Sequence, residues 1–221
     1  MSLLSPQRTD PDSRPPDQTL SFVNPLAKGR VLVVSAVGDA DGSCGAAAAL
    51  ACARAEVDAA TLLVAAGGRA PRPTLIASAA AQKLEERLAA RLPGHRVAAR
   101  GQVCHLAVPA EAEGLEAAAA AATLARDGVT VLHVPPRLLQ PALVCPTLRP
   151  SGVLLRANLC DDRSLVGLVV RELLDSGLAV AVLKRRLHWV AERRALFGVL
   201  PPGGSGGLSE RLVQRLCGPP R

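Results

Sequence analysis

Aromatic residues are almost absent from this chain of 221 residues: they make up 1% of it, and tyrosine does not occur. Proteins that hold single-stranded nucleic acid without sequence preference stack the bases on aromatic side chains. The shortage argues against that class of function. Apolar residues nevertheless reach 49%, so we expect an aliphatic core built from alanine, leucine and valine.

Paired metal-binding cysteines and long apolar runs are lacking as well. The chain has six cysteines, and no two of them have the CxxC spacing of zinc sites. No run approaches the roughly 18 apolar residues of a membrane-spanning helix, and the N-terminus lacks the apolar segment of a signal peptide. These absences predict a cytoplasmic protein with reduced thiols, no transmembrane segment and no bound metal.

Lysine is scarce, so arginine carries nearly all of the net charge of +7. A basic surface can bind DNA phosphates or an acidic partner. A solvated helix face is the simpler interpretation, and we favour it. The densest basic cluster, which includes one tryptophan, lies in a helix expected over 184–196 and consists of Arg185, Arg186, Trp189, Arg193 and Arg194.

Strand and helix patterns alternate through most of the chain. The apolar strands show no period-2 alternation, which is typical of strands buried on both faces of a mostly parallel sheet. We therefore predict a doubly wound α/β domain over 29–202, after a disordered N-terminal arm (1–28) and before a Gly-rich hinge with an amphipathic helix (203–221). The predicted strands cover 30–36, 61–65, 96–108 (one or two strands), 129–134, 152–156, 178–183 and 197–201, and the helices cover 43–55, 74–91, 111–126, 138–143, 161–176 and 184–196.

The first strand runs into a loop with Gly38, Gly42 and Gly45 and then into an alanine-rich helix. A strand, a glycine loop and a helix open many nucleotide-binding α/β folds, because the loop directs backbone N–H groups and a helix N-terminus at a phosphate. The GxGxxG pattern of dinucleotide-binding folds is not met. Asp39 and Asp41 in the loop could bind a metal, but we favour the interpretation as solvated turn residues, which would also repel a phosphate.

Four stretches, in the same order, resemble the MinD/ParA family of P-loop ATPases and its relatives in Flp/Tad pilus assembly. The resemblance covers about residues 30–202 and implies a P-loop NTPase-like three-layer sandwich, ATP as the family's ligand and a dimer that encloses it. The stretches are VLVVSAVGDADGSCGAAAALA for the phosphate loop, TLLVAAGGRAPRPTLIA for the second strand and its switch, VTVLHVPPRL for the Walker B strand, and LAVAVLKRR with LFGVLPP for the nucleobase-binding end.

The phosphate loop of the resembled family is degenerate here. Ser43 stands where the family has its phosphate-binding lysine, Cys44 where it has the Mg²⁺-binding threonine, and Gly38 near its second, signature lysine. A hydroxyl cannot supply the charge with which lysine reaches the β- and γ-phosphates. On this interpretation Gly38, Gly42 and Gly45 serve the tight turn and close packing of the helix on the sheet. Weak phosphate binding through backbone amides is the alternative.

The other three motifs depart from the family in the same way. Ala65 and Gly67 stand where acidic residues would position water and metal, His133 replaces the Walker B aspartate, and Lys184 occupies the place of the adenine-reading asparagine. A catalytic pair of Cys44 and His133 is one alternative for the histidine, but a structural role at the strand end is favoured. Without these groups, hydrolysis has no evident mechanism.

The residues and the resemblance together predict a pseudo-ATPase that keeps the fold without the catalysis. We expect no cofactor, with weak ATP binding as the alternative. We expect an interaction or regulatory scaffold that binds a protein partner, and a homodimer is a further expected assembly. The resemblance implies a role in localisation or assembly of a cell-envelope or pilus machine. The rival is an ATPase switch with an unorthodox loop. DNA or membrane-surface contact is less favoured.

Overall fold

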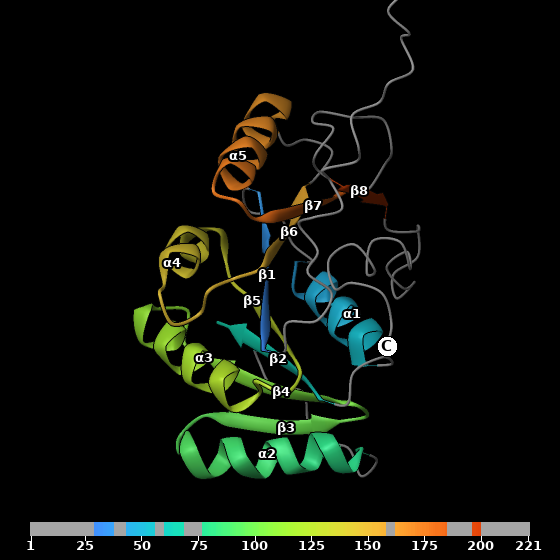
Figure 1. Ribbon diagram of the computed structural model, residues 1–221, viewed down its shortest axis with the longest axis vertical. Coiled ribbons are helices and arrows are strands. Elements are labelled where there is room, and N and C mark those ends of the chain that lie inside the picture. The colour runs from blue at the N-terminus through green and yellow to red at the C-terminus, as the bar shows by residue number, and fades with distance from the viewer. Residues whose placement is uncertain are drawn as a thin grey trace, which may run out of the picture.

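A computed structural model describes residues 29–37, 43–55, 60–68, 77–157, 162–184 and 196–199. Within these ranges the chain forms an eight-stranded sheet in the order β3-β4-β2-β5-β1-β6-β7-β8, with helices on both faces (Figure 1). All neighbouring strands are parallel except the β3–β4 pair, which is antiparallel. The predicted doubly wound, mostly parallel α/β sandwich is therefore confirmed.

The elements follow the predicted alternation. The strands are β1 (Arg30–Ala36), β2 (Thr61–Ala66), β3 (Arg96–Arg100), β4 (Val103–Val108), β5 (Val129–His133), β6 (Gly152–Ala157), β7 (Ala179–Lys184) and β8 (Leu196–Val199). The helices are α1 (Ser43–Ala55), α2 (Ala79–Arg91), α3 (Ala112–Leu124), α4 (Leu139–Val144), which follows the 3₁₀ turn η2 (Pro136–Leu138), and α5 (Arg163–Asp175).

Strand β1 is the centre of the sheet, and all seven of its residues are buried. It pairs with β5 on one side and with β6 on the other. Because side chains alternate between the two faces of a strand, β1 contributes to two cores. Leu32 and Val34 pack with α1, whereas Val31 and Val33 belong to the core that α2, α3, α4 and α5 cover.

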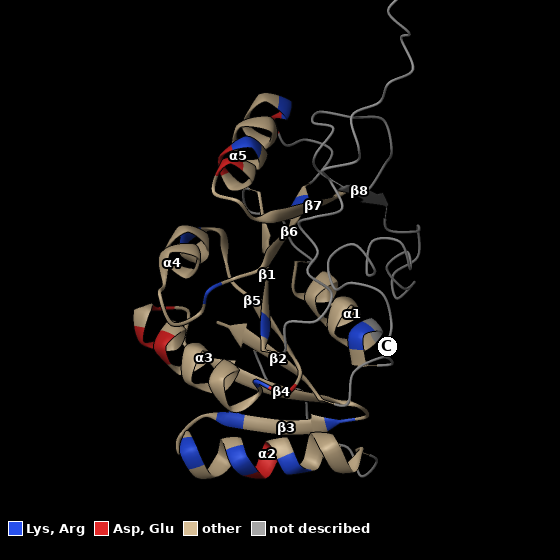
Figure 2. Ribbon diagram, in the orientation of Figure 1, with Lys and Arg blue, Asp and Glu red and all other residues tan. Residues whose placement is uncertain are grey.

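Small side chains let helix α3 lie close to the sheet. Its alanine run is largely buried, and Gly114 in its first turn faces the carbonyl of Pro109, where a Cβ atom would overlap the backbone. Close helix–sheet contact thus replaces the bulky aromatic packing that this chain lacks. Figure 2 shows that charged residues alternate with uncharged ones along α2, as expected for a helix with one buried face, whereas on α3 the acidic residues gather at one end.

Side-chain hydrogen bonds cap the N-termini of α2 and α5 and so define where these two helices begin. Helix α2 begins at Ala79, so the predicted start at 74 is wrong: Ala77 forms a β-bridge with Gly101, and the Ser78 hydroxyl accepts a hydrogen bond from the Ala81 amide at 3.2 Å. Of the two aspartates that could cap α5, Asp162 does so, because its carboxylate accepts from the Ser164 amide at 2.8 Å.

The region 96–108 forms two strands joined by a two-residue turn, in which Gly101 adopts a φ of 58° that favours glycine. None of the described helices combines the length and apolar character needed to cross a membrane. The N-terminal arm and the C-terminal helix fall outside the described residues, and the predictions made for them stay predictions. The bounds predicted for the basic helix, 184–196, are wrong at both ends, because Lys184 ends β7 and Leu196 starts β8, and residues 185–195 lie outside the described ranges.

Gly114 and Gly167 offer a matched test of the close packing, because both lie in helices. We expect Gly114→Ala to lower the free energy of unfolding by about 1–3 kcal/mol, since α3 must move away from Pro109. A Cβ at Gly167 meets no atom within 4 Å, so Gly167→Ala should raise it by about 0.5–1 kcal/mol through helix propensity. Urea denaturation measures both, and equal effects would contradict the packing argument.

Candidate functional site

The carboxyl end of β1 lies at the point where the sheet changes winding direction. From β1 the chain passes through α1 to β2, beyond β5, whereas from β5 it passes through α4 to β6, on the opposite side of β1. In open α/β sheets, ligands bind outside the carboxyl ends of the strands at such a switch point. Helix α1 starts here, as the glycine-loop motif predicts.

Ser43 and His133 meet at this point. His133 ends β5, in register with Val34 of β1 and Ala65 of β2, and it lies on the α1 face because it follows Val129 and Val131 at two-residue intervals. The Ser43 hydroxyl and the His133 Nε2 atom are 2.9 Å apart. The side chains assigned to two separate motifs of the resembled family thus form one hydrogen bond, across 90 positions of sequence.

The pair is uncharged near neutral pH. Burial lowers the pKa of His133, so the imidazole is neutral at pH 7, and Ser43 is only 7% exposed. The His133 Nδ1 atom is buried, and it has no hydrogen-bond partner among the described residues. A serine beside a neutral imidazole resembles a nucleophile and its base, but an acidic residue that would orient the ring is not found among its described partners.

The alternative pairing of Cys44 with His133 does not form. Cys44 is exposed on α1, and the imidazole bonds Ser43 instead. The prediction that Gly45 serves close helix–sheet packing is wrong. Gly45 is exposed, and a Cβ atom there would meet nothing within 4 Å. Ala46 and Ala47, which follow it, are the residues that face the sheet.

The acidic positions of the resembled family carry no carboxylate at the described ends of β1, β2 and β5. Ala65 is half-buried beside His133, and Gly67 has a φ of 72°, with its amide bonded to the Val108 carbonyl at 2.9 Å. Across the part of the chain that the structure describes, no group of three or more His, Cys, Asp or Glu side chains could hold a metal ion.

The remaining predicted site residues are placed only in part. Lys184 ends β7, where it pairs with Ala157 of β6 and Val199 of β8. The predicted residues that lie outside the described ranges are Gly38 and Gly42 of the loop and the partner-binding cluster Arg185, Arg186, Trp189, Arg193 and Arg194.

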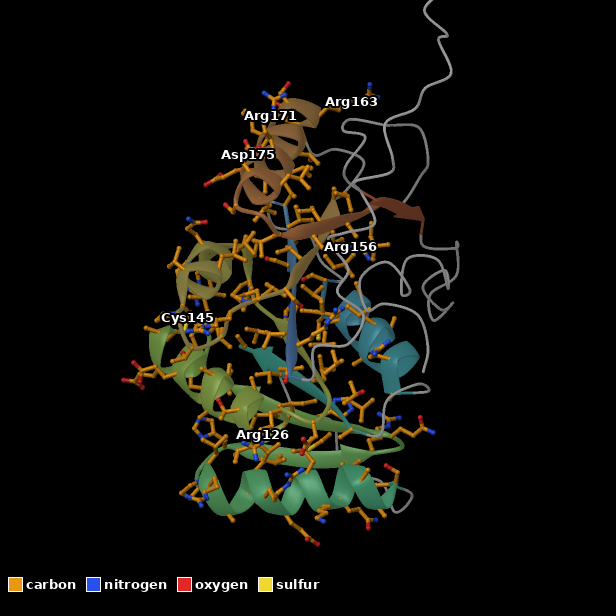
Figure 3. The ribbon with its side chains drawn as sticks, in the orientation of Figure 1. Arg126, Cys145, Arg156, Arg163, Arg171 and Asp175 are labelled. Carbon is orange, nitrogen blue, oxygen red and sulfur yellow. The ribbon has the colours of Figure 1, made fainter. Side chains whose placement is uncertain are left out.

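One charged residue at this edge escaped the sequence analysis. Arg156, near the end of β6, is in register with Ala36 of β1 and lies on the α1 side of the sheet (Figure 3). Its Nε atom is buried and has no hydrogen-bond partner among the described residues. The available signal was an arginine inside an otherwise apolar strand, GVLLRA, because a buried strand rarely carries a charge without a reason.

The lowered pKa of His133 predicts a pH-dependent stability. Unfolding restores the ordinary pKa of about 6.5, so below that pH the unfolded chain binds more protons than the folded chain, and the free energy of unfolding falls as the pH is lowered. His133→Gln should therefore show a smaller loss of melting temperature between pH 7.5 and pH 5.5, conditions chosen to span about one unit either side of that pKa.

His105 supplies the matched control, because burial and then the nearby Arg100 charge lower the pKa of this imidazole too. His105→Gln should remove its own share of the pH dependence, and the double variant should remove both shares, since separate sites contribute independently. An unchanged loss of melting temperature in His133→Gln would contradict the assignment of a buried, neutral imidazole to the site.

No family model matches the chain, and no curated protein matches it. Among solved structures, the chain is similar to the MinC:MinD cell division protein complex of Aquifex aeolicus, with 16% identity over 86% of this chain and 87% of that chain and a TM-score of 0.48. It is also similar to a ParA family ATPase from Chlorobium tepidum TLS, with 10% identity over 86% of this chain and 81% of that chain and a TM-score of 0.47.

Proposed function

We propose that the chain is a pseudo-ATPase scaffold: a MinD/ParA-like fold that acts by binding protein partners, without ATP hydrolysis. The observation that supports this most is the hydrogen bond between Ser43 and His133. The bond joins two uncharged side chains, and the resemblance aligns these with the phosphate-binding lysine and the Walker B aspartate that a P-loop ATPase needs. The resemblance adds the expected setting, which is the localisation or assembly of a cell-envelope or pilus machine from the cytoplasmic side.

Catalysis of phosphoryl transfer rests almost entirely on positioning and on charges that stabilise the transferred group. A serine hydroxyl and an uncharged imidazole offer hydrogen bonds but no fixed charge. In this proposal the scaffold does not depend on a bound nucleotide. It acts through its contacts with protein partners. The basic cluster Arg185, Arg186, Trp189, Arg193 and Arg194 is the candidate contact surface from the sequence, with homodimerisation as a second use of the fold.

A nucleotide-binding switch is the second candidate function, and Arg156 is the observation that favours it. The guanidinium lies on the face of the sheet that carries α1, and its buried Nε lacks a partner among the described residues. Arginine binds phosphate through paired N–H donors, so Arg156 can supply, from a different strand, the positive charge that Ser43 lacks.

We expect full-length protein to give no heat of binding and no thermal shift with millimolar Mg²⁺-ATP. A ligand at ten times its Kd raises the free energy of unfolding by about 1.4 kcal/mol, which is readily detected as a shift in Tm. The oligomeric mass by light scattering should also be the same with and without nucleotide. Saturable binding, or release of phosphate above a no-protein control, would sink the scaffold proposal.

Arg156→Gln decides between the two candidates if any nucleotide binding is found. A switch that relies on this guanidinium should lose about tenfold or more in affinity, because a charge-assisted hydrogen bond contributes about 1.5–3 kcal/mol. Arg126→Gln is the control, since Arg126 follows α3 and lies far from Arg156 (Figure 3). Equal affinities in Arg156→Gln, Arg126→Gln and the unmodified chain would remove Arg156 from the site.

A further inference from the structure

A cavity opens at the edge of the sheet, past the carboxyl end of β4. It has a volume of about 440 Å³ and lies between the turn after α2, the start of β3, the end of β4 and the first turn of α3. Small-molecule sites have volumes of about 300–1,000 Å³. Neither Ser43 nor His133 lines this cavity.

Two opposite charges line this cavity without neutralising each other. Arg96 starts β3 and Glu113 lies in the first turn of α3, and both side chains are exposed. Among the described residues, no ion pair joins them. Figure 2 shows the basic start of β3 and the acidic start of α3 on the same side of the molecule. A ligand that carries both a negative and a positive group would meet both.

The backbone fixes the positions of these two charges. Arg96 is paired with Ala107 of β4 in the antiparallel ladder. The first turn of α3 is held against Pro109, because Gly114 permits the close approach described above. Ligand binding therefore does not have to order the backbone at either position, which favours affinity.

The half-buried His95 ring forms a further part of the cavity wall. Ala107, Val108 and Pro109 form an apolar part of the same wall, which suits a small aliphatic group.

We propose that this cavity binds a small zwitterion of amino-acid or dipeptide size with an aliphatic side chain. The ligand carboxylate pairs with the Arg96 guanidinium, and the ligand ammonium pairs with the Glu113 carboxylate. The aliphatic group lies against Val108. This site is independent of the proposed pseudo-ATPase function, because it shares no residue with the Ser43–His133 pair.

The test uses the full-length chain and the dipeptide L-alanyl-L-leucine, with calorimetry as the readout. We expect saturable binding in the millimolar range. Amidation of the dipeptide's carboxylate, or acetylation of its amine, should weaken binding about tenfold or more, because each removes one charge-assisted contact. No binding of the dipeptide or of free L-leucine at millimolar concentration would overturn the proposal.

Substitutions then assign each charge to its partner. Arg96→Gln should bind the dipeptide and its amide equally, and Glu113→Gln should bind the dipeptide and its acetylated form equally. Arg100→Gln and Glu116→Gln are matched controls on the same strand and the same helix, and both should keep the full discrimination. If Arg96→Gln or Glu113→Gln still discriminates as the unmodified chain does, the proposed contacts are wrong. Both residues are exposed, so thermal melts can verify that the variants are folded.

Discussion

Burial of β1 on both faces and along both edges is the constraint on which the rest of the molecule depends. A strand that pairs in parallel on each side must be reached by crossover connections, and the helices of these crossovers cover both faces. The same pairing sets the geometry of the candidate site. His133 is level with Val34 of β1 and Arg156 is level with Ala36, two residues further along. These side chains are therefore placed by sheet register, which one slipped residue would destroy.

The aliphatic core accounts for the cavity between β4 and α3 as well as for the fold. With so few aromatic side chains, the layers are held by alanine, valine and leucine at short separations, and α3 can approach β4 because Gly114 leaves room for the Pro109 carbonyl. That approach brings the acidic first turn of α3 close to β4, which pairs with the strand that carries Arg96. Packing with small residues thus brings Arg96 and Glu113 to the same cavity, although neither side chain is part of the core.

The sequence was most informative where an apolar run and a helix pattern had clear limits. Strand β1 and helix α1 have the predicted bounds, because the loop glycines separate a buried strand from an alanine-rich helix. The start of α2 was missed because Leu75 continues its apolar stripe, while the capping hydroxyl of Ser78 is a weaker local signal than the stripe. A tertiary contact sets where α2 begins, since Ala77 pairs with Gly101 and cannot be helical.

The candidate site was predictable in its place but not in its contacts. The loop and the strand ends were assigned from motifs, yet the bond from Ser43 to His133 depends on the register of β1 and β5, which no local pattern encodes. The alternative thiol, Cys44, is one residue further along the helix and therefore turns about 100° away, toward solvent. Arg156 was overlooked because the strand around it was interpreted as uniformly apolar.

The Ser43–His133 pair at the switch point carries no charge, unlike the lysine of a P-loop ATPase. A lysine in this place would be a desolvated charge until a phosphate arrived, so an ATPase is held in its active arrangement by its ligand. Ser43 and His133 satisfy each other without a ligand, and what remains unsatisfied is one ring nitrogen of the imidazole. The bond between the two side chains therefore holds this end of β5 against the start of α1 without a charged group at either position.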